Sequence, residues 1–231
     1  MRILLDAISD NDFIRGPDRY VLGLLQGLAE IDAENSYVLA YAPWQKFFEE
    51  ISLPANFEHL RLAPPRDRVL RVAWHAATFP RLAARLAPDL VHLTNIIFAP
   101  GIGRPVVMTV HDLAHFRFPE KFGVVRGRLQ RYLIRSALRV PDRVIAVSRF
   151  SAGDIGKFTS YPQDRVRVVY EGTPRLTPAE PFRHSRPYFL YVGQLERSKN
   201  IEQLIDEFAE SAALADTDLL IAGKPGTAAS R

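Results

Sequence analysis

A histidine and an aspartate, His111 and Asp112, directly follow a stretch that is typical of a buried strand. Residues 105–110 (PVVMTV) are almost wholly apolar and rich in β-branched side chains, as in the strands of a parallel sheet. In such sheets the ligand crevice lies just beyond the carboxyl ends of the strands. An imidazole placed there can exchange a proton near neutral pH. His111 is therefore a candidate site residue. The plainer alternative is that His111 and Asp112 only turn the chain and satisfy each other.

These residues need a sheet to position them, and the chain alternates strands and helices in the way that builds one. After a first strand and a loop over residues 8–16, Asp18 is expected to cap a helix that runs to about Ile31. The segment IRGPDRY is not a GxGxxG sequence, so a dinucleotide cofactor at this point is not supported. Expected strands cover residues 2–7, 36–42, 57–62, 89–94, 104–110, 142–147 and 165–170.

Helices are expected between these strands. Pro43 precedes a short helix over residues 44–51, and Ser148 caps a helix that reaches about Lys157. Residues 66–76 and 79–87 form one or two basic amphipathic helices, split near Pro80. This alternation predicts an α/β fold with a Rossmann-like, doubly wound parallel sheet.

A proline-rich stretch divides the chain. Residues 174–187 hold four prolines and no apolar periodicity, which indicates a semi-rigid linker. Beyond it the pattern predicts one βαβ unit, with strands at 188–192 and 218–222 and a helix over 200–213. The expected domains are thus 1–175, a linker at 176–187, and an incomplete second Rossmann-like domain at 188–231. A lone βαβ unit cannot bury both faces of its sheet, so it packs on the first domain, pairs with another chain, or belongs to a longer parent.

Composition narrows the classes of function. The 231 residues include no cysteine, which excludes disulfides, thiolate metal sites and thiol nucleophiles and is compatible with a reducing cytosol. The N-terminal sequence reaches Asp6 too soon to form a signal-peptide core. No apolar run approaches the roughly 18 to 20 residues of a membrane span. These features predict a cytoplasmic protein.

Positive charge is concentrated in the middle of the chain. Between Arg61 and Arg149 there are 16 Lys/Arg and 5 Asp/Glu, a net charge of +11 in a chain whose overall net charge is +4. Such a block suggests an anionic surface or ligand, such as phospholipid headgroups or phosphates. Nucleic acid is not expected, because zinc-finger, helix-turn-helix and RNA-binding-sheet signatures are absent. The alternative is a solvated arginine-rich face.

Residues 123–139 contribute much of this charge. Arginines at 126, 128, 131, 135 and 139 are interleaved with apolar residues, which predicts a basic amphipathic helix. One interpretation is an ordinary layer helix that covers the sheet. The other is a helix that lies on an acidic membrane, with the protein peripheral on its inner face.

Four segments taken in order resemble a GT-B glycosyltransferase of the large retaining family 4. They are MRILLDA with GPDRYVLGLLQGLAE, VVMTVHDLAHFRFPE, DRVIAVSRFSAGDIGKF with RVRVVYEGTP, and YFLYVGQLERSKNIEQLIDEFA with LLIAGKPG. Each segment alone is common, but together they span nearly the whole chain. The resemblance implies two Rossmann-like domains that face a cleft, an acceptor on the N-terminal side, a nucleotide-diphosphate sugar on the C-terminal side, and no metal or other cofactor.

The resemblance also assigns residues. His111 matches the family's active-site histidine, and Gly16, Arg19 and Asp112 fall in segments that line the acceptor side of the cleft. Lys199 matches the lysine that holds the donor diphosphate, where a fixed ammonium and helix N-terminal amides stabilise the charge of the leaving group. The alternatives are a plain helix entry for Gly16 and Arg19 and a solvated residue before a helix for Lys199.

Two departures from the family pattern concern the donor site. The family usually has arginine where this chain has Gln194, beside Gly193, and a neutral amide cannot clamp a diphosphate as a guanidinium can. Arg197 is close enough in sequence to substitute. The paired glutamates that grip the nucleotide sugar in the family are expected beyond position 231, so the resemblance covers a truncated second domain.

These observations predict a glycosyltransferase, or a fragment of one, of the hexosyltransferase type. It would transfer a sugar from a nucleotide-diphosphate sugar to a glycan or lipid-linked acceptor in cell-envelope polysaccharide biosynthesis. The alternative is an inactive remnant or an acceptor-binding interaction module.

Overall fold

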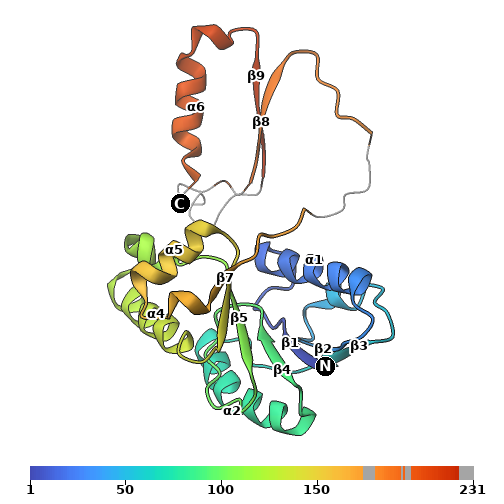
Figure 1. Cartoon of the computed structure of the whole chain (residues 1–231). Helices are drawn as coiled ribbons and strands as arrows, with labels where there is room; N and C mark the ends of the chain where they lie inside the picture. The colour runs from blue at the N-terminus through green and yellow to red at the C-terminus, as the bar shows by residue number, and fades with distance from the viewer. Residues whose placement is uncertain (174–179, 194, 196–198, 224–231) are drawn as a thin grey trace. The chain divides into compact units, whose positions relative to one another are not determined.

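The computed structural model describes residues 1–173, 180–193, 195 and 199–223, without the side chains of residues 68, 120, 121 and 213. The predicted contributions of Gln194 and Arg197 lie outside the described residues. The chain divides into two compact units, Met1–Pro174 (unit 1) and Arg175–Arg231 (unit 2), and each is described by itself (Figure 1).

Unit 1 is built on a seven-stranded parallel sheet in the order β3-β2-β1-β4-β5-β6-β7. The strand order reverses direction between β1 and β4, which is the switch point of a doubly wound fold. The predicted α/β class and parallel sheet are therefore confirmed. The strands are β1 (Arg2–Asp6), β2 (Ser36–Tyr41), β3 (Phe57–Arg61), β4 (Leu90–Leu93), β5 (Val106–Val110), β6 (Arg143–Ala146) and β7 (Val166–Val168).

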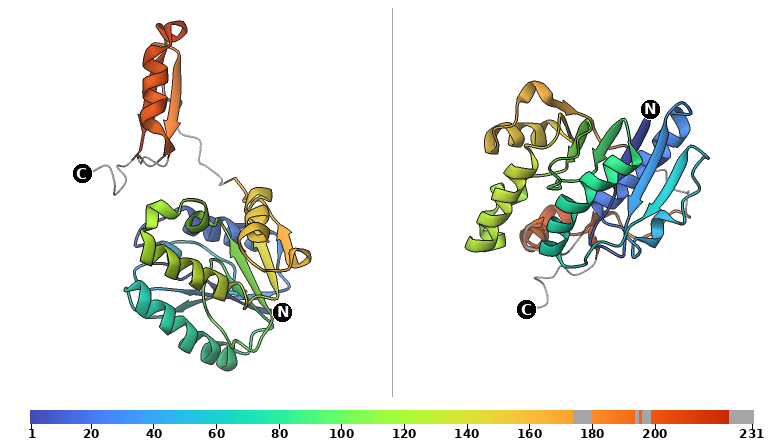
Figure 2. Two further views of the ribbon diagram at one scale, coloured as in Figure 1. Left: turned by 90° about the vertical axis from the view of Figure 1, so that its left-hand side faces the viewer. Right: turned by 90° about the horizontal axis from the view of Figure 1, so that it is seen from below.

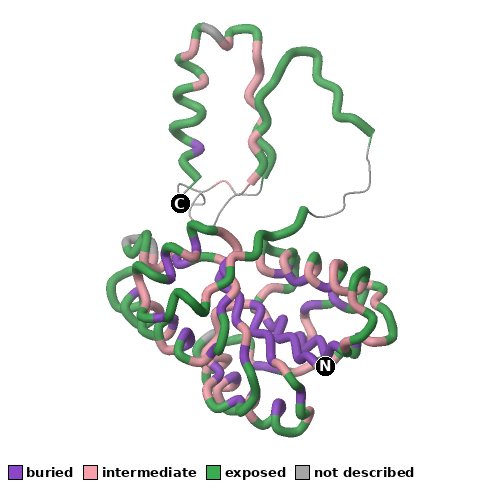
Figure 3. The backbone as a smooth tube through the Cα atoms, viewed as in Figure 1, coloured by how far each residue is buried: buried purple, intermediate pink, exposed green. Residues whose placement is uncertain are grey.

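Helices cover both faces of this sheet, and successive strand residues point into two separate cores. Leu5 packs with α1 residues such as Leu25, whereas its neighbour Leu4 belongs to the core under α2, α4 and α5. The buried residues follow the sheet in Figure 3, and Figure 2 shows the helical layers from two further sides. The helical segments of unit 1 are α1 (Gly16–Ile31), η1 (Lys46–Phe48), α2 (Arg68–Leu86), α3 (Ala114–Arg117), η2 (Pro119–Phe122), α4 (Val124–Ala137), α5 (Arg149–Phe158) and η3 (Gln163–Arg165).

Three local predictions are corrected. Asp18 is not the cap of α1: Arg15 holds that position, and the Asp18 side chain accepts a hydrogen bond from the Arg15 backbone N–H at 3.0 Å. Of the one or two helices expected over 66–76 and 79–87 the structure has one, α2 (Arg68–Leu86), and the expected split near Pro80 is absent. The short helix expected over 44–51 is only the three-residue 3₁₀ turn η1. By contrast, Ser148 caps α5 as predicted, accepting from the Ser151 backbone N–H at 3.0 Å.

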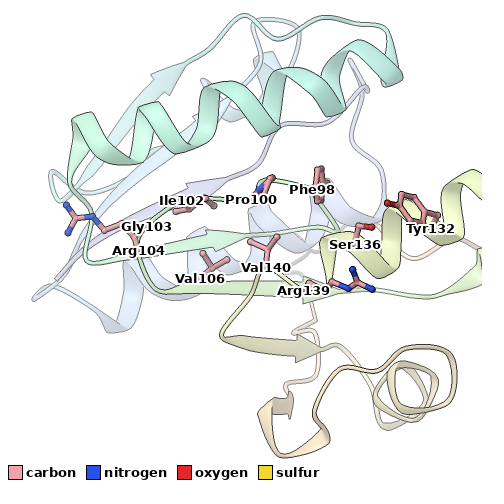
Figure 4. A pocket seen from close by; sticks show the side chains of 11 residues that line it. Phe98, Pro100, Ile102, Gly103, Arg104, Val106, Tyr132, Ser136, Arg139 and Val140 are labelled. Carbon is pink, nitrogen blue, oxygen red and sulfur yellow. The ribbon is translucent and has the colours of Figure 1, made fainter.

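The connection between β4 and β5 contains no helix, which leaves a hollow on one face of the sheet. The cavity has a volume of about 480 Å³ and is lined by the connecting loop and by the last turns of α4, as Figure 4 shows. Phe98 and Ile102 come from the loop, and Tyr132, Ser136 and Arg139 come from α4 and the residues after it. A helix at this place would fill the space, because helical crossovers normally cover the faces of parallel sheets.

Unit 2 is a two-stranded parallel sheet with one long helix. The predicted strands β8 (Tyr188–Val192) and β9 (Asp218–Ala222) are confirmed, and between them lie α6 (Ile201–Glu210) and the turn η5 (Ala212–Leu214). The Phe189 ring contacts the Phe208 ring of α6, yet Phe189 is exposed, as are Leu190 and Val192. Among the described residues of this unit, Ile201 alone is a buried apolar residue.

Candidate functional site

The carboxyl edge of the unit 1 sheet gathers the polar side chains of the candidate site. His111 directly follows β5 and is 15% exposed. Thr94 follows β4, and Glu171 lies three residues beyond β7. Because all the strands are parallel, their carboxyl ends meet at the same edge. His111, which was predicted to be a site residue because it follows a strand, therefore lies beside Thr94 and Glu171, which are distant from it in sequence.

Four contacts fix the position of His111. Its Nε2 lies 3.0 Å from the Thr94 carbonyl oxygen, and its Nδ1 lies 3.1 Å from Oε1 of Glu171. The edge of its ring meets the Tyr20 ring at 4.9 Å between centroids. Its backbone carbonyl accepts a hydrogen bond from the Ser151 hydroxyl at 2.9 Å, which ties the residue to the first turn of α5. A carbonyl oxygen can only accept, so Nε2 of His111 carries a hydrogen.

A buried hydroxyl chain lies next to His111. The Tyr20 hydroxyl is 3.0 Å from the Thr109 hydroxyl, which in turn is 2.9 Å from Nε2 of His92. Burial raises the pKa of Tyr20, and the nearby Glu171 carboxylate raises it further. Burial lowers the pKa of His92 to about 4, with a smaller contribution from the neighbouring His111. Both groups are therefore uncharged near neutral pH, and Tyr20 connects this hydrogen-bonded chain to the His111 ring.

Asp112 does not pair with His111. Its Oδ1 accepts a hydrogen bond from the Ala114 backbone N–H at 3.0 Å, which turns the chain into α3. The alternative in which His111 and Asp112 satisfy each other is therefore wrong. Asp112 is exposed at the same edge as His111.

Gly16 and Arg19 lie at the start of α1, on the helix that also supplies Tyr20. Both residues are exposed, and the space around the Gly16 α-carbon is open. Among the described residues, the Arg19 side chain has no hydrogen-bond or ion-pair partner. Arg19 is thus a free cation on the helix that reaches His111.

The loop before α1 is held by a buried polar network. The fully buried Gln45 donates from Nε2 to the Ala7 carbonyl at 2.9 Å and accepts at Oε1 from the Ala42 N–H at 2.9 Å. Asp18, also buried, accepts from the Ser9 hydroxyl at 3.0 Å. These bonds fix the base of the loop over residues 8–15 that precedes Gly16, because buried polar groups are costly to leave unpaired.

Unit 2 places its predicted residues at the corresponding edge of its own small sheet. Gly193 follows β8, and its N–H donates to the Ala222 carbonyl at 3.0 Å. A Cβ atom on Gly223 would lie 1.7 Å from the Gly193 carbonyl oxygen, so the backbones approach too closely there for any other residue. Lys199 is exposed and stands two residues before α6. His111 and Lys199 belong to different units and are described separately.

Sequence reasoning missed three contributors to the site. Glu171, Tyr20 and the Thr94 carbonyl all contact His111. Glu171 could have been found from the sequence, because it comes shortly after the seventh strand as His111 comes after the fifth. Tyr20 lies within the helix predicted after the first strand, where no local pattern marks it as a site residue.

Within the described residues, no group of three or more His, Asp or Glu side chains is placed to hold a metal ion. No helix there has the length and apolar character needed to cross a bilayer.

Comparison with known proteins identifies relatives of the chain. The family model of Glycosyltransferase Family 4 matches residues 14–174. O-antigen chain mannosyltransferase B of Escherichia coli is 28% identical over an alignment of 167 residues, and the match covers 67% of this chain and 40% of that protein.

Two solved structures share the fold. The glycosyltransferase WaaG, involved in lipopolysaccharide biosynthesis, superposes with a TM-score of 0.63 at 14% identity over 98% of this chain and 64% of that one. The lipopolysaccharide outer core galactosyltransferase WaaB gives a TM-score of 0.58 at 17% identity over 99% of this chain and 62% of that one. The chain thus spans 40% of the curated relative's length and less than two thirds of either structure's. Since the family model covers more than half of its residues, the chain belongs to glycosyltransferase family 4.

Proposed function

We propose that the chain acts in glycosyl transfer, moving a sugar from a nucleotide-diphosphate sugar to a glycan or lipid-linked acceptor in cell-envelope polysaccharide biosynthesis. The observation that supports this most is the match of residues 14–174 to the family 4 model, a span that includes the whole His111 cluster. The named functions of the mannosyltransferase and of the two lipopolysaccharide enzymes agree with it. Retention of anomeric configuration is part of the proposal.

In this proposal the two units divide the work. Unit 1 holds the acceptor near His111, Gly16 and Arg19, and the reaction occurs beside the His111 ring. Unit 2 holds the diphosphate through Lys199, Gly193 and the N-terminal amides of α6, and Gln194 and Arg197, which lie outside the described residues, are proposed to contribute as well. As the bond between the sugar and the diphosphate breaks, negative charge grows on the leaving phosphate, and an ammonium and oriented amides stabilise it. No step of this chemistry calls on a metal ion.

Titration calorimetry with GDP-mannose, UDP-glucose and UDP-galactose tests the donor site. We expect one of them to bind the chain, and Lys199→Ala to weaken that binding by about tenfold, because one direct charge contact to phosphate is lost. Lys46→Ala is the matched control, since Lys46 is also an exposed lysine but lies on η1. Equal affinity of Lys199→Ala and wild type would show that Lys199 does not hold the donor.

An acceptor-binding module without catalysis is the second candidate. The observation that favours it is the small core of unit 2, where Phe189, Leu190 and Val192 are exposed and two strands form the described donor side. The same titrations decide between the two: if no nucleotide sugar binds while a glycan acceptor does, the module is supported and transfer by this chain is not.

We further propose a peripheral contact between α4 and an anionic membrane. The helix packs on the sheet through Ile134 and Ala137, yet its outer side exposes Val125 (82% exposed) and Leu129 (51% exposed). Unpaired arginines such as Arg128 flank them among the described residues. Apolar side chains between cations are the pattern of a helix that lies in a membrane interface. Covering the sheet and touching a membrane are therefore compatible roles for α4.

Co-sedimentation with vesicles tests this contact. We expect binding to vesicles that contain anionic phospholipid and not to purely zwitterionic ones, and we expect Val125→Ser/Leu129→Ser to reduce it several-fold. The control Val69→Ser/Leu70→Ser removes an equally exposed apolar pair from the first turn of α2. Equal sedimentation with both kinds of vesicle, or an equal loss in the control, would contradict the proposal.

A further inference from the structure

Glu171 is the one carboxylate that contacts the His111 ring in the described part of the chain. It lies just beyond β7 on a backbone segment that places Oε1 3.1 Å from Nδ1 of His111, and its side chain is 47% exposed. The two residues are 60 positions apart in sequence, so the contact depends on the parallel arrangement of β5 and β7. Half-exposed glutamates normally turn to solvent, and this one points back to the site instead.

The hydrogen-bond partners of His111 determine which of its ring nitrogens carry a hydrogen. Nε2 of His111 faces the Thr94 carbonyl and so carries a hydrogen. In a neutral ring Nδ1 would then have a lone pair, which would face a carboxylate lone pair at 3.1 Å. Such a contact is repulsive unless a hydrogen lies between the two atoms. The pair therefore shares one hydrogen, and both ring nitrogens of His111 are already engaged.

Consequently the ring itself has no free acceptor for a substrate. The free acceptor at this point is Oε2 of Glu171, which has no hydrogen-bond partner among the described residues. His111 fixes Oε1 and thereby orients Oε2 at the carboxyl edge of the sheet. The Tyr20 ring, which packs on the edge of the His111 ring, limits the positions that the pair can adopt.

We infer that Glu171 is a substrate-contacting residue whose Oε2 accepts a hydrogen bond from a sugar hydroxyl, with His111 as its positioning partner. That the ligand is a sugar rests on the proposed function, and a carboxylate is a suitable partner for a sugar hydroxyl. A carboxylate binds hydroxyl donors through strong charge-assisted hydrogen bonds and repels phosphate. Glu171 would thus select the uncharged part of a nucleotide sugar or glycan for this place and keep the diphosphate away from it.

The first experiment tests the contact between His111 and Glu171 in the absence of substrate. Nitrogen-15 spectra of the histidine rings at pH 7 are recorded for the wild-type chain, for Glu171→Ala and for Glu50→Gln, with His111→Gln used to assign the signals. We expect the Nδ1 signal of His111 to move toward that of a nitrogen without hydrogen in Glu171→Ala, and to stay in place in Glu50→Gln, whose exposed glutamate follows η1. An unmoved signal in Glu171→Ala would overturn the pairing.

The second experiment measures the contact to the sugar. The nucleotide sugar that binds wild type is titrated into Glu171→Ala, Glu171→Gln and Glu50→Gln. We expect about tenfold weaker binding for Glu171→Ala, a smaller loss for Glu171→Gln because the amide oxygen still accepts, and no change for Glu50→Gln. Wild-type affinity in Glu171→Ala would overturn the sugar contact alone. Failure of wild type to bind any nucleotide sugar or glycan would overturn the proposed function and the contact together.

Discussion

Replacing His75 by alanine should lower the free energy of unfolding by about 3 to 5 kcal/mol. Asp6, at the end of β1, is fully buried, and Nε2 of His75 from α2 lies 3.2 Å from its Oδ2. The other carboxylate oxygen already accepts from the Ile8 N–H at 3.1 Å. Oδ2 and Nε2 contact each other without a hydrogen bond, and neither atom has a hydrogen-bond partner among the described residues. Without the imidazole, Oδ2 would lose this one polar neighbour in the core, and an isolated buried carboxylate costs far more than a lost surface contact.

Urea unfolding followed by tryptophan fluorescence measures this loss. Both tryptophans, Trp44 and Trp74, belong to unit 1, so the signal reports the unit that contains the pair. His59→Ala removes an exposed histidine from β3 and is expected to change stability by less than about 1 kcal/mol. The double variant Asp6→Asn/His75→Ala should be more stable than His75→Ala, because it also removes the buried Asp6 carboxylate. A loss below about 1 kcal/mol in His75→Ala would contradict the role assigned to the pair.

Acidification should destabilise unit 1 by about 3 kcal/mol through His92 alone. The pKa of His92 is lowered to about 4 in the folded chain, whereas an unfolded histidine has a pKa of about 6.5. Between these values the unfolded chain binds a proton that the folded chain does not, so stability decreases as pH falls from about 6.5 toward 4. Above about 6.5 both states are neutral at this position, and the contribution is constant.

The measurement compares the pH dependence of unfolding in wild type and His92→Gln. Glutamine retains an amide that can bond the Thr109 hydroxyl but does not titrate, so the stability of the variant should vary less between pH 7 and pH 4. His59→Gln, which removes an exposed histidine, should keep the wild-type slope. Parallel curves for wild type and His92→Gln would show that His92 is not responsible.

Sequence periodicity predicted the sheet well because each strand has its own apolar pattern. The bounds of β8 and β9 agree with the prediction residue by residue, and the others differ by one or two residues at an end. Pro80 does not split α2 as predicted: proline usually ends a helix, but Phe79, Leu82 and Ala83 are buried on both sides of it, and their packing keeps α2 continuous. Asp18 has the residue type of a cap, yet the backbone before it makes Arg15 the first helical boundary.

The candidate site was only partly predictable for a different reason. His111 could be found from a local rule, since it is the first residue after a buried strand. Its partners come from β4, α1 and the end of β7, and no pattern within one segment specifies that these three meet. The network of Gln45 is similar: the glutamine follows β2 in the chain, but its bonds reach Ala7 and Ser9. Such contacts depend on tertiary structure.

The helix-free connection from β4 to β5 determines the shape of the surface around the cavity. The crossover from β4 to β5 is too short to include a helix. Loop side chains therefore line the space that a helix would otherwise occupy. The concavity in Figure 4 therefore follows from the topology, and Arg104, Tyr132 and Arg139 are among the residues that line it. Proteins with the same helix-free crossover should retain the depression.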